Sequence, residues 1–247
     1  MEISKDHPRY RSLMTREKLS ELSKEGILAP TGLIAHGRGE AFDYLLGERT
    51  VPAANEAAKV AAAHLLEARR PIITVNGNAA GLCAKGLISL ANAIPARLEV
   101  NIFHRTPGRI ERLCNYLEEL GGRDILGREQ DALLKGIESD RARCSSEGIG
   151  SADVVLIPLE DGDRASALAA AGKVVLAIDL NPLSRTAIAA DVAVVDEITR
   201  AVPNIERHVY DLKGQPQDRR FLIDSFSNEN NLSLIKRTMC KSLFQKS

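Results

Sequence analysis

Short apolar runs alternate with stretches of helical spacing along most of the chain. The runs, rich in valine, isoleucine and leucine, cover residues 71–75, 97–103, 153–159, 173–178 and 191–195. Strands that are apolar on both faces are typical of parallel sheets covered by helices. The pattern therefore predicts an α/β fold with a Rossmann-like, doubly wound, mainly parallel sheet.

A helical N-terminal segment is predicted before the first strand. Residues 16–22 have apolar positions at helical spacing, with Thr15 as a possible cap and Gly26 as a stop, so that Arg16 lies in the first turn. The helix dipole makes a positive charge slightly unfavourable in the first turn, so the side chain of Arg16 could instead contact a group outside the helix.

The next segment, residues 29–44, has glycines around a short apolar run and polar side chains of both signs, including His36 and Arg38. Glycines allow close backbone approach, and successive free amides can cradle an anion. We therefore expect a ligand site here. The alternative is an ordinary turn before a helix over residues 40–46, with its charges in solvent.

Polar side chains follow each apolar run, where the carboxyl ends of parallel strands share one edge of the sheet. Open α/β sheets bind their ligands at that edge. The residues singled out, in chain order, are Asn76, Asn78, Arg105, Glu160, Asp161, Asp163, Asp179, Asn181, Arg185, Asp196 and Glu197.

Two groups of these residues, those after the third run and those after the fourth, indicate particular ligands. The loop with Asp179, Asn181 and Arg185 offers a carboxylate, an amide and a guanidinium, which suits a nucleotide. The three carboxylates around Gly162 exceed what helix capping needs, and the surplus charge predicts Mg²⁺ or an ammonium substrate. The chain has neither a Gly-x-Gly-x-x-Gly fingerprint nor a Walker A motif.

Length and composition set the domain organisation. The 247 residues predict one α/β domain over 1–203, whose first 50 residues contribute to the site, and a C-terminal extension over 204–247. Residues 228–244 are expected to form a terminal helix. Residues 132–147 also have a helical pattern, with the charges of Asp140, Arg141 and Arg143 on a solvated face.

The charge balance and the cysteines narrow the function classes. Lysine plus arginine equals aspartate plus glutamate at 33 each, so no global attraction to nucleic acid or to an anionic membrane is expected. The four cysteines are far apart and match no zinc spacing, so no metal-ligand set is expected. Without a signal-peptide pattern or a membrane-spanning run, a cytoplasmic location is expected.

Four longer motifs carry a family resemblance. They span residues 32–48, 75–78, 158–164 and 177–186. With them the chain resembles the archaeal 4-phosphopantoate–β-alanine ligases, also called phosphopantothenate synthetases, from residue 7 to about residue 201. The resemblance implies a homodimeric, ATP-dependent ligase of coenzyme A biosynthesis. It would form an acyl-adenylate from 4-phosphopantoate, release pyrophosphate, and pass the acyl group to β-alanine with release of AMP.

The resemblance also implies which residues contact ATP. The matching positions are Arg16, Arg38, Asp179, Leu180, Asn181, Arg185, Thr186, Asp196, Glu197 and Ile198. The chain departs from the family pattern at two positions, where Glu197 replaces an asparagine and Ser139 a histidine.

Adenylation needs mainly positioning and positive charge, which Arg16, Arg38 and Arg105 could supply. Arg38 and His36 are the expected catalytic residues. Asn76, Asn78, Arg105, Glu160, Asp161 and Asp163 are the expected substrate contacts, and Mg²⁺ is expected with ATP. Two other classes stay open, a NAD(P)-dependent Rossmann oxidoreductase and a non-catalytic nucleotide-binding module.

Overall fold

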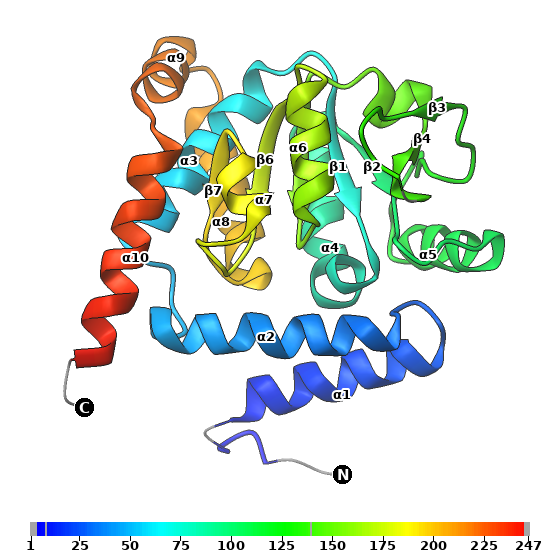
Figure 1. Cartoon of the computed structure of the whole chain (residues 1–247), viewed down its shortest axis with the longest axis horizontal. Coiled ribbons are helices and arrows are strands. Elements are labelled where there is room, and N and C mark those ends of the chain that lie inside the picture. The colour runs from blue at the N-terminus through cyan, green and yellow to red at the C-terminus, as the bar shows by residue number, and fades with distance from the viewer. Residues whose placement is uncertain (1–3, 8, 139, 245–247) are drawn as a thin grey trace.

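The computed structural model describes residues 4–7, 9–138 and 140–244. Its main sheet has five parallel strands in the order β2-β1-β5-β6-β7. These strands are β1 (Pro71–Val75), β2 (Arg97–Val100), β5 (Val154–Pro158), β6 (Val174–Ile178) and β7 (Val192–Val194) (Figure 1). Because the strand order reverses between β1 and β5, the sheet is doubly wound, and the predicted fold class is confirmed.

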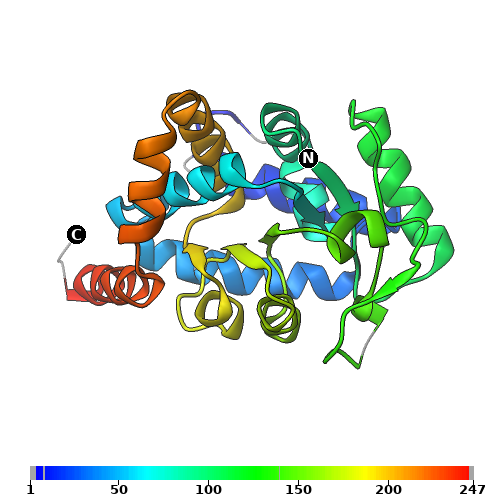
Figure 2. The same ribbon diagram turned by 90° about the horizontal axis from the view of Figure 1, so that it is seen from above.

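Helices cover both faces of the sheet, as the runs of apolar residues require. Alternate residues such as Ile73 and Leu156 pack against the first face, and Ile72 and Val155 against the second. The first face is covered by α3 (Pro52–Glu67), α4 (Gly77–Ala93), α5 (Pro107–Glu119) and α8 (Ile198–Leu212). The second is covered by α6 (Gly162–Ala170) and α7 (Arg185–Ala189) (Figure 2).

Two antiparallel helices, α1 (Tyr10–Lys24) and α2 (Pro30–Leu46), lie along the carboxyl edge of the sheet (Figure 1). The glycine-rich loop predicted there is wrong, because α2 continues through all of those glycines. Pro30 at its first position and left-handed Gly47 at its C-cap define its ends. Gly32 lets α2 approach α4 closely, since a side chain there would meet Asn78 and Leu28.

The first helix also differs from its predicted bounds. It begins at Tyr10, so Thr15 lies inside it rather than at its cap, and Arg16 lies in its second turn. The early start adds residues 10–15 ahead of the pattern that predicted the helix. Arg16 is therefore clear of the helix end, where the dipole would have opposed its charge.

The C-terminal region is helical. Helix α8 continues through Pro203, where the domain boundary was predicted, and it packs against α3 and α4. Helices α9 (Pro216–Ser225) and α10 (Asn228–Phe244) follow, and α10 has the predicted bounds. Leu232, Ile235 and Met239 of α10 are buried against the end of α2 and β7.

The helix predicted over residues 132–147 is wrong. This region holds a small antiparallel pair, β3 (Ala132–Leu133) and β4 (Arg143–Cys144), with a 3₁₀ turn (Asp140–Ala142) between them. Tertiary hydrogen bonds override the local pattern here. Fully buried Glu99 accepts hydrogen bonds from the backbone amides of Ser145 and Ile149, at 3.0 and 2.7 Å. Ser139 lies outside the described residues. Among the described helices, none is long and apolar enough to cross a membrane.

Candidate functional site

Two adjoining cavities lie at the carboxyl edge of the sheet, under α2. The first chamber has a volume of about 330 Å³ and the second about 350 Å³. Ala35, Asn78, Leu159 and Asp161 line both, so these residues form the wall between them. Asn78 follows β1 and Leu159 follows β5, the two strands between which the sheet reverses its order. This is where doubly wound sheets bind ligands.

The first chamber brings together most of the residues predicted as site residues. They come from α2 and from the loops after β1, β5, β6 and β7. The predicted residues that line it are His36, Arg38, Asn78, Glu160, Asp161, Asp179, Leu180, Asn181, Arg185, Thr186, Glu197 and Ile198.

The loop after β6 is shaped by its own polar side chains. The carboxylate of Asp179 accepts hydrogen bonds from the hydroxyl of Ser184 and from the backbone amide of Asn181. The side-chain oxygen of Asn181 accepts one from the amide of Leu183 at 2.9 Å. Burial raises the pKa of Asp179, although these hydrogen bonds and the charge of Arg38 oppose the rise. The loop is therefore pre-formed before any ligand enters.

Helix N-termini surround the first chamber. Helices α6, α7 and α8 all begin at residues that line it or directly adjoin it. Thr186 donates a hydrogen bond to the carbonyl of Glu160 at 2.7 Å, which joins α7 to the end of β5. A side chain at Gly162 would collide with Arg185, so glycine is needed for this close approach. The N-terminus of α6 has no side-chain cap among the described residues and therefore favours an anionic group, whereas at α8 the carboxylate of Glu197 already accepts from the backbone amide of Thr199 at 2.9 Å.

A cluster of charges holds α2 over this chamber. Arg200 of α8 donates to the carboxylate of Asp43 on α2 and to that of Asp196 after β7, the latter at 2.9 Å. Thr50 also donates to Asp196, at 2.5 Å. Asp196 was predicted as an ATP contact, but its side chain is 1% exposed and is already bonded within the protein.

Several other predicted residues lie outside the first chamber. Arg16 of α1 does not line the first chamber, but it pairs at 2.9 Å with Glu40 of α2, which does. Arg105 donates to the carbonyl of Gly127, and Asp163 pairs with Arg185 at the surface. Asn76 caps α4 and donates to the carbonyls of Pro158 and Leu159, so its side chain is structural although it adjoins the second chamber.

The second chamber is lined by cationic and helix-terminal groups. Arg109 of α5 and Arg141 both contribute to its wall, together with His104 and the first residues of α4. Within the described parts of the chain, Arg109 donates only to backbone carbonyls, those of Gly26, Ile27 and His104. Burial lowers its pKa, yet the guanidinium stays charged at neutral pH. The chamber is thus suited to an anionic ligand.

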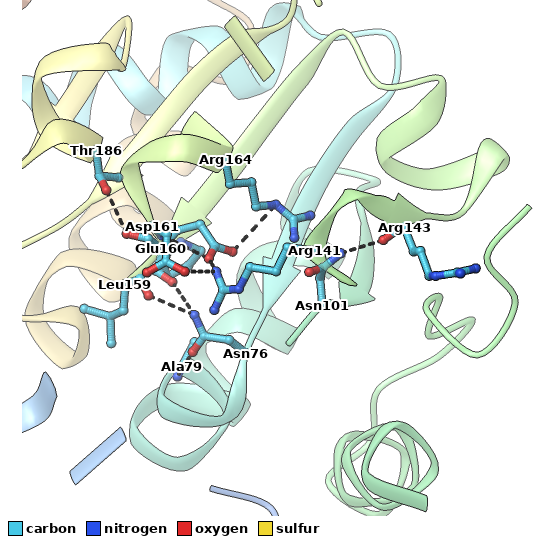
Figure 3. Close-up of polar contacts among 11 residues, drawn as sticks. Asn76, Ala79, Asn101, Arg141, Arg143, Leu159, Glu160, Asp161, Arg164 and Thr186 are labelled. Carbon is cyan, nitrogen blue, oxygen red and sulfur yellow. Dashed lines mark hydrogen bonds and ion pairs between the residues drawn. The ribbon is translucent and has the colours of Figure 1, made fainter. Parts of the chain in front are cut away.

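A buried charge cluster lies behind the wall between the chambers (Figure 3). The side chain of Glu160 is fully buried and contacts Arg141 and Arg164, while Arg141 also pairs with Asp161 at 3.2 Å. The carboxylates of this turn were predicted to need Mg²⁺ or an ammonium substrate. For Glu160 that prediction is wrong, because arginines of the protein supply the positive charge. Within the described residues, no group of three or more metal-ligating side chains occurs.

Arg141 and Arg164 also belong to this region, although neither was predicted from the sequence as a site residue. Arg141 was assigned to a solvated helix face, but it is 8% exposed. Arg164 lies one turn into α6 and is 1% exposed. The only signal in the sequence was the surplus of carboxylates in 160–163, which requires positive charge from somewhere.

Comparisons with known proteins agree in pointing to one family. The family described as phosphopantothenate/pantothenate synthetase matches residues 53–242. The 4-phosphopantoate–beta-alanine ligase of Methanospirillum hungatei is 53% identical over 210 residues, which cover 85% of this chain and 86% of that protein. The enzyme of the same name from Methanosarcina mazei is 46% identical and covers 94% and 92%. That from Thermococcus kodakarensis is 45% identical and covers 94% and 89%.

Proposed function

Since the chain belongs to the phosphopantothenate/pantothenate synthetase family, we propose that it joins 4-phosphopantoate to β-alanine in an ATP-dependent ligase reaction. Its membership confirms the resemblance seen in the sequence motifs. The observation that carries the proposal is the pair of adjoining chambers, both lined by guanidinium groups and helix N-termini. Two anionic substrates that must react with each other require such an arrangement.

ATP is assigned to the first chamber. The pre-formed loop of Asp179 and Asn181 suits the ribose and base, and the uncapped N-terminus of α6 suits the phosphates. 4-Phosphopantoate is assigned to the second chamber, where Arg109 and Arg141 offer positive charge. Its carboxylate then meets the α-phosphate of ATP at the shared wall of Leu159 and Asp161.

The reaction proposed has two steps. A carboxylate oxygen of 4-phosphopantoate bonds to the α-phosphorus of ATP, and the bond to the bridging oxygen breaks to release pyrophosphate. The ammonium group of β-alanine then loses a proton to water, and the neutral amine attacks the acyl carbon. The bond from that carbon to the AMP oxygen breaks, AMP leaves, and the second proton of the new amide nitrogen passes to solvent. Arg38 spreads the charge that develops on the α-phosphate. His36 lies beside it on α2, with its Nε2 atom 3.9 Å from Glu40 and without a hydrogen-bond partner in the described part of the chain.

β-Alanine and Mg²⁺ are assigned by the charges of the groups that they would meet. Half-exposed Asp161 on the shared wall is suited to draw the ammonium group of β-alanine toward the acyl carbon. Mg²⁺ enters with ATP as part of the substrate, since it needs only one or two protein carboxylates beside the phosphates. The proposal includes a homodimer, which light scattering on the purified protein tests.

A nicotinamide-dependent oxidoreductase is a weaker proposal. A dinucleotide would lay its pyrophosphate on the turn between β1 and α4. That turn packs against α2, because Asn78 donates to the carbonyl of Gly32 at 3.1 Å. The turn also lacks the glycine fingerprint.

The test is pyrophosphate exchange into ATP, measured with and without 4-phosphopantoate, followed by AMP release on adding β-alanine. We expect exchange only with 4-phosphopantoate. Arg38→Ala should keep the fold and lose roughly 3 kcal/mol of transition-state stabilisation, about a hundredfold in rate. Arg237→Ala on exposed α10 is the matched control and should keep full activity. A folded wild type without exchange, or an Arg38→Ala variant with wild-type turnover, refutes the proposal.

A further inference from the structure

We propose that Glu160 is a positioning residue for the ligase reaction, which holds Arg141 at the wall of the second chamber so that Arg141 can bind the acyl substrate. The inference rests on the function proposed above and assigns roles that the sequence did not indicate. It depends on three features of the turn after β5: its backbone conformation, the buried arginine behind it, and the two carboxylates that hold Arg141.

The backbone of this turn is strained. Leu159 has a φ of 53°, in the left-handed region, where a residue other than glycine costs about 1–3 kcal/mol. Three hydrogen bonds maintain it: the Asn76 amide donates to the carbonyls of Pro158 and Leu159, and the Leu159 amide donates to Ile178. Strain held in this way is found where a turn must direct a particular side chain. Here it directs Glu160 into the protein, between Arg164 and Arg141 (Figure 3).

The charge of Arg164 makes the carboxylate of Glu160 necessary. Arg164 is the most buried arginine at the site, and its Nε atom lies 3.7 Å from Glu160. None of its three guanidinium nitrogens has a hydrogen-bond partner among the described residues. Burial lowers the pKa of Arg164 to about 10, so it remains charged at neutral pH. Two other carboxylates also act on Arg164: Glu99, which already accepts two backbone hydrogen bonds, and half-exposed Asp161. Glu160 is therefore the fully buried carboxylate left to face both arginines.

Arg141 is held from two sides that differ in exposure. Glu160 contacts it from the interior with a fully buried carboxylate, and Asp161 pairs with it from the wall of the chambers with a carboxylate that is 55% exposed. The guanidinium also lies over the ring of Phe103, 5.8 Å from its centre. A substrate anion in the second chamber can displace Asp161, but it does not meet the side chain of Glu160, which is fully buried and does not line that chamber. Arg141 thus exchanges one partner for the substrate and keeps the other, and the planar guanidinium suits a carboxylate or phosphate.

The exchange would release Asp161 at the moment when the acyl substrate is bound. The freed carboxylate lies on the wall that both chambers share, where the amine of β-alanine must arrive. Glu160 takes no part in bond making. Its effect on the reaction passes through Arg141, which contacts the substrate.

The test compares Glu160→Gln, Arg141→Lys and the double variant Glu160→Gln/Arg164→Met. The double variant removes one buried charge of each sign, so the cluster keeps its balance while Arg141 still lacks its interior partner. The assays are 4-phosphopantoate-dependent pyrophosphate exchange, giving KM for each substrate, and thermal unfolding. Glu160→Gln should raise KM for 4-phosphopantoate at least about tenfold, with KM for ATP within about twofold, and should lower Tm.

The variant Glu160→Gln/Arg164→Met separates the effect of Glu160 on the position of Arg141 from its effect on stability. We expect the Tm of this variant to return toward the wild-type value while its KM for 4-phosphopantoate stays raised. A fourth variant, Glu160→Gln/Arg141→Lys, should have a KM for 4-phosphopantoate no higher than that of Arg141→Lys alone, because both substitutions act through the guanidinium of Arg141. If the double variant recovers Tm and KM together, Glu160 is only structural. If KM for 4-phosphopantoate is unchanged in all folded variants while the wild type is active, the inference fails and the proposed function stands. A wild type without exchange refutes both.

Discussion

Replacing Arg200 with methionine should loosen α2 from the rest of the site. Arg200 is the only described residue that joins the carboxylates of Asp43 and Asp196, and these lie 153 positions apart in the sequence (196 minus 43). Burial alone would lower the pKa of Arg200, but the hydrogen bond to Asp43 and the charge of Asp196 raise it overall. Because Arg38 and His36 lie on α2, their positions depend on this link.

The cost follows from how buried the three groups are. The side chains of Arg200, Asp43 and Asp196 are 21%, 12% and 1% exposed. Removing one partner of a buried pair costs about 3–5 kcal/mol, and the partial exposure of Arg200 places the change near the lower value. For a chain of this size, about 3 kcal/mol lowers Tm by roughly 6–12 °C. Methionine keeps most of the side-chain volume, so the change reports charge rather than a cavity.

The assay is thermal unfolding together with KM for ATP in pyrophosphate exchange. Arg200→Met should lower Tm and raise KM for ATP. Arg219→Met is the matched control, since Arg219 pairs with Glu67 at 2.6 Å with 15% exposure but lies on α9, away from both chambers. The control should lower Tm without changing KM for ATP. The reasoning fails if Arg200→Met costs less than about 1 kcal/mol, or if the two variants change KM equally.

Three further predictions follow from the same kind of contact. Asn76→Ala should cost about 2–4 kcal/mol in urea unfolding, since it removes the cap of α4 and two donated hydrogen bonds, whereas Asn76→Asp keeps the cap and should cost less. Burial and then Arg207 lower the pKa of His208, so the unfolded chain binds its proton more readily. Its contribution to stability is therefore full above about pH 6.5 and falls as the pH drops below that value, and His208→Gln should flatten the pH dependence of Tm. Burial raises the pKa of the thiols of Cys83, Cys114 and Cys144 to about 11, so iodoacetamide at pH 8 should first label exposed Cys240, as peptide mass spectrometry would show.

The sheet and its ligand edge were predictable because their signals are local and strong. Each of the runs at 71–75, 153–159 and 173–178 is apolar on both faces, which only a covered parallel strand explains. The residues after those runs then had to share one edge. This is why Asn78, Asp161 and Asn181 were predicted as site residues before the topology was known, and all three line the first chamber.

The errors arose where distant contacts decide the structure. The glycines of residues 32–39 resembled an anion-binding loop, but they lie in a helix that packs closely on α4 and Leu180. Residues 132–147 resembled a helix, but buried Glu99 and Asn101 bind the backbone of that segment in an extended form. A single sequence holds no local sign of a partner 40 or more positions away.

The arginines of the site fall into two groups: those already paired with a carboxylate and those free to bind a substrate anion directly. Arg185 pairs with Asp163, Arg200 with Asp43 and Asp196, and Arg141 with Glu160 and Asp161. By contrast, Arg38 has no carboxylate within ion-pair distance in the described chain, and Arg109 contacts only carbonyls. An anion that binds a paired arginine must first displace a carboxylate. Arg38 and Arg109, one in each chamber, are therefore the expected first contacts, for ATP and for the acyl substrate respectively, and Arg141 engages only after Asp161 yields.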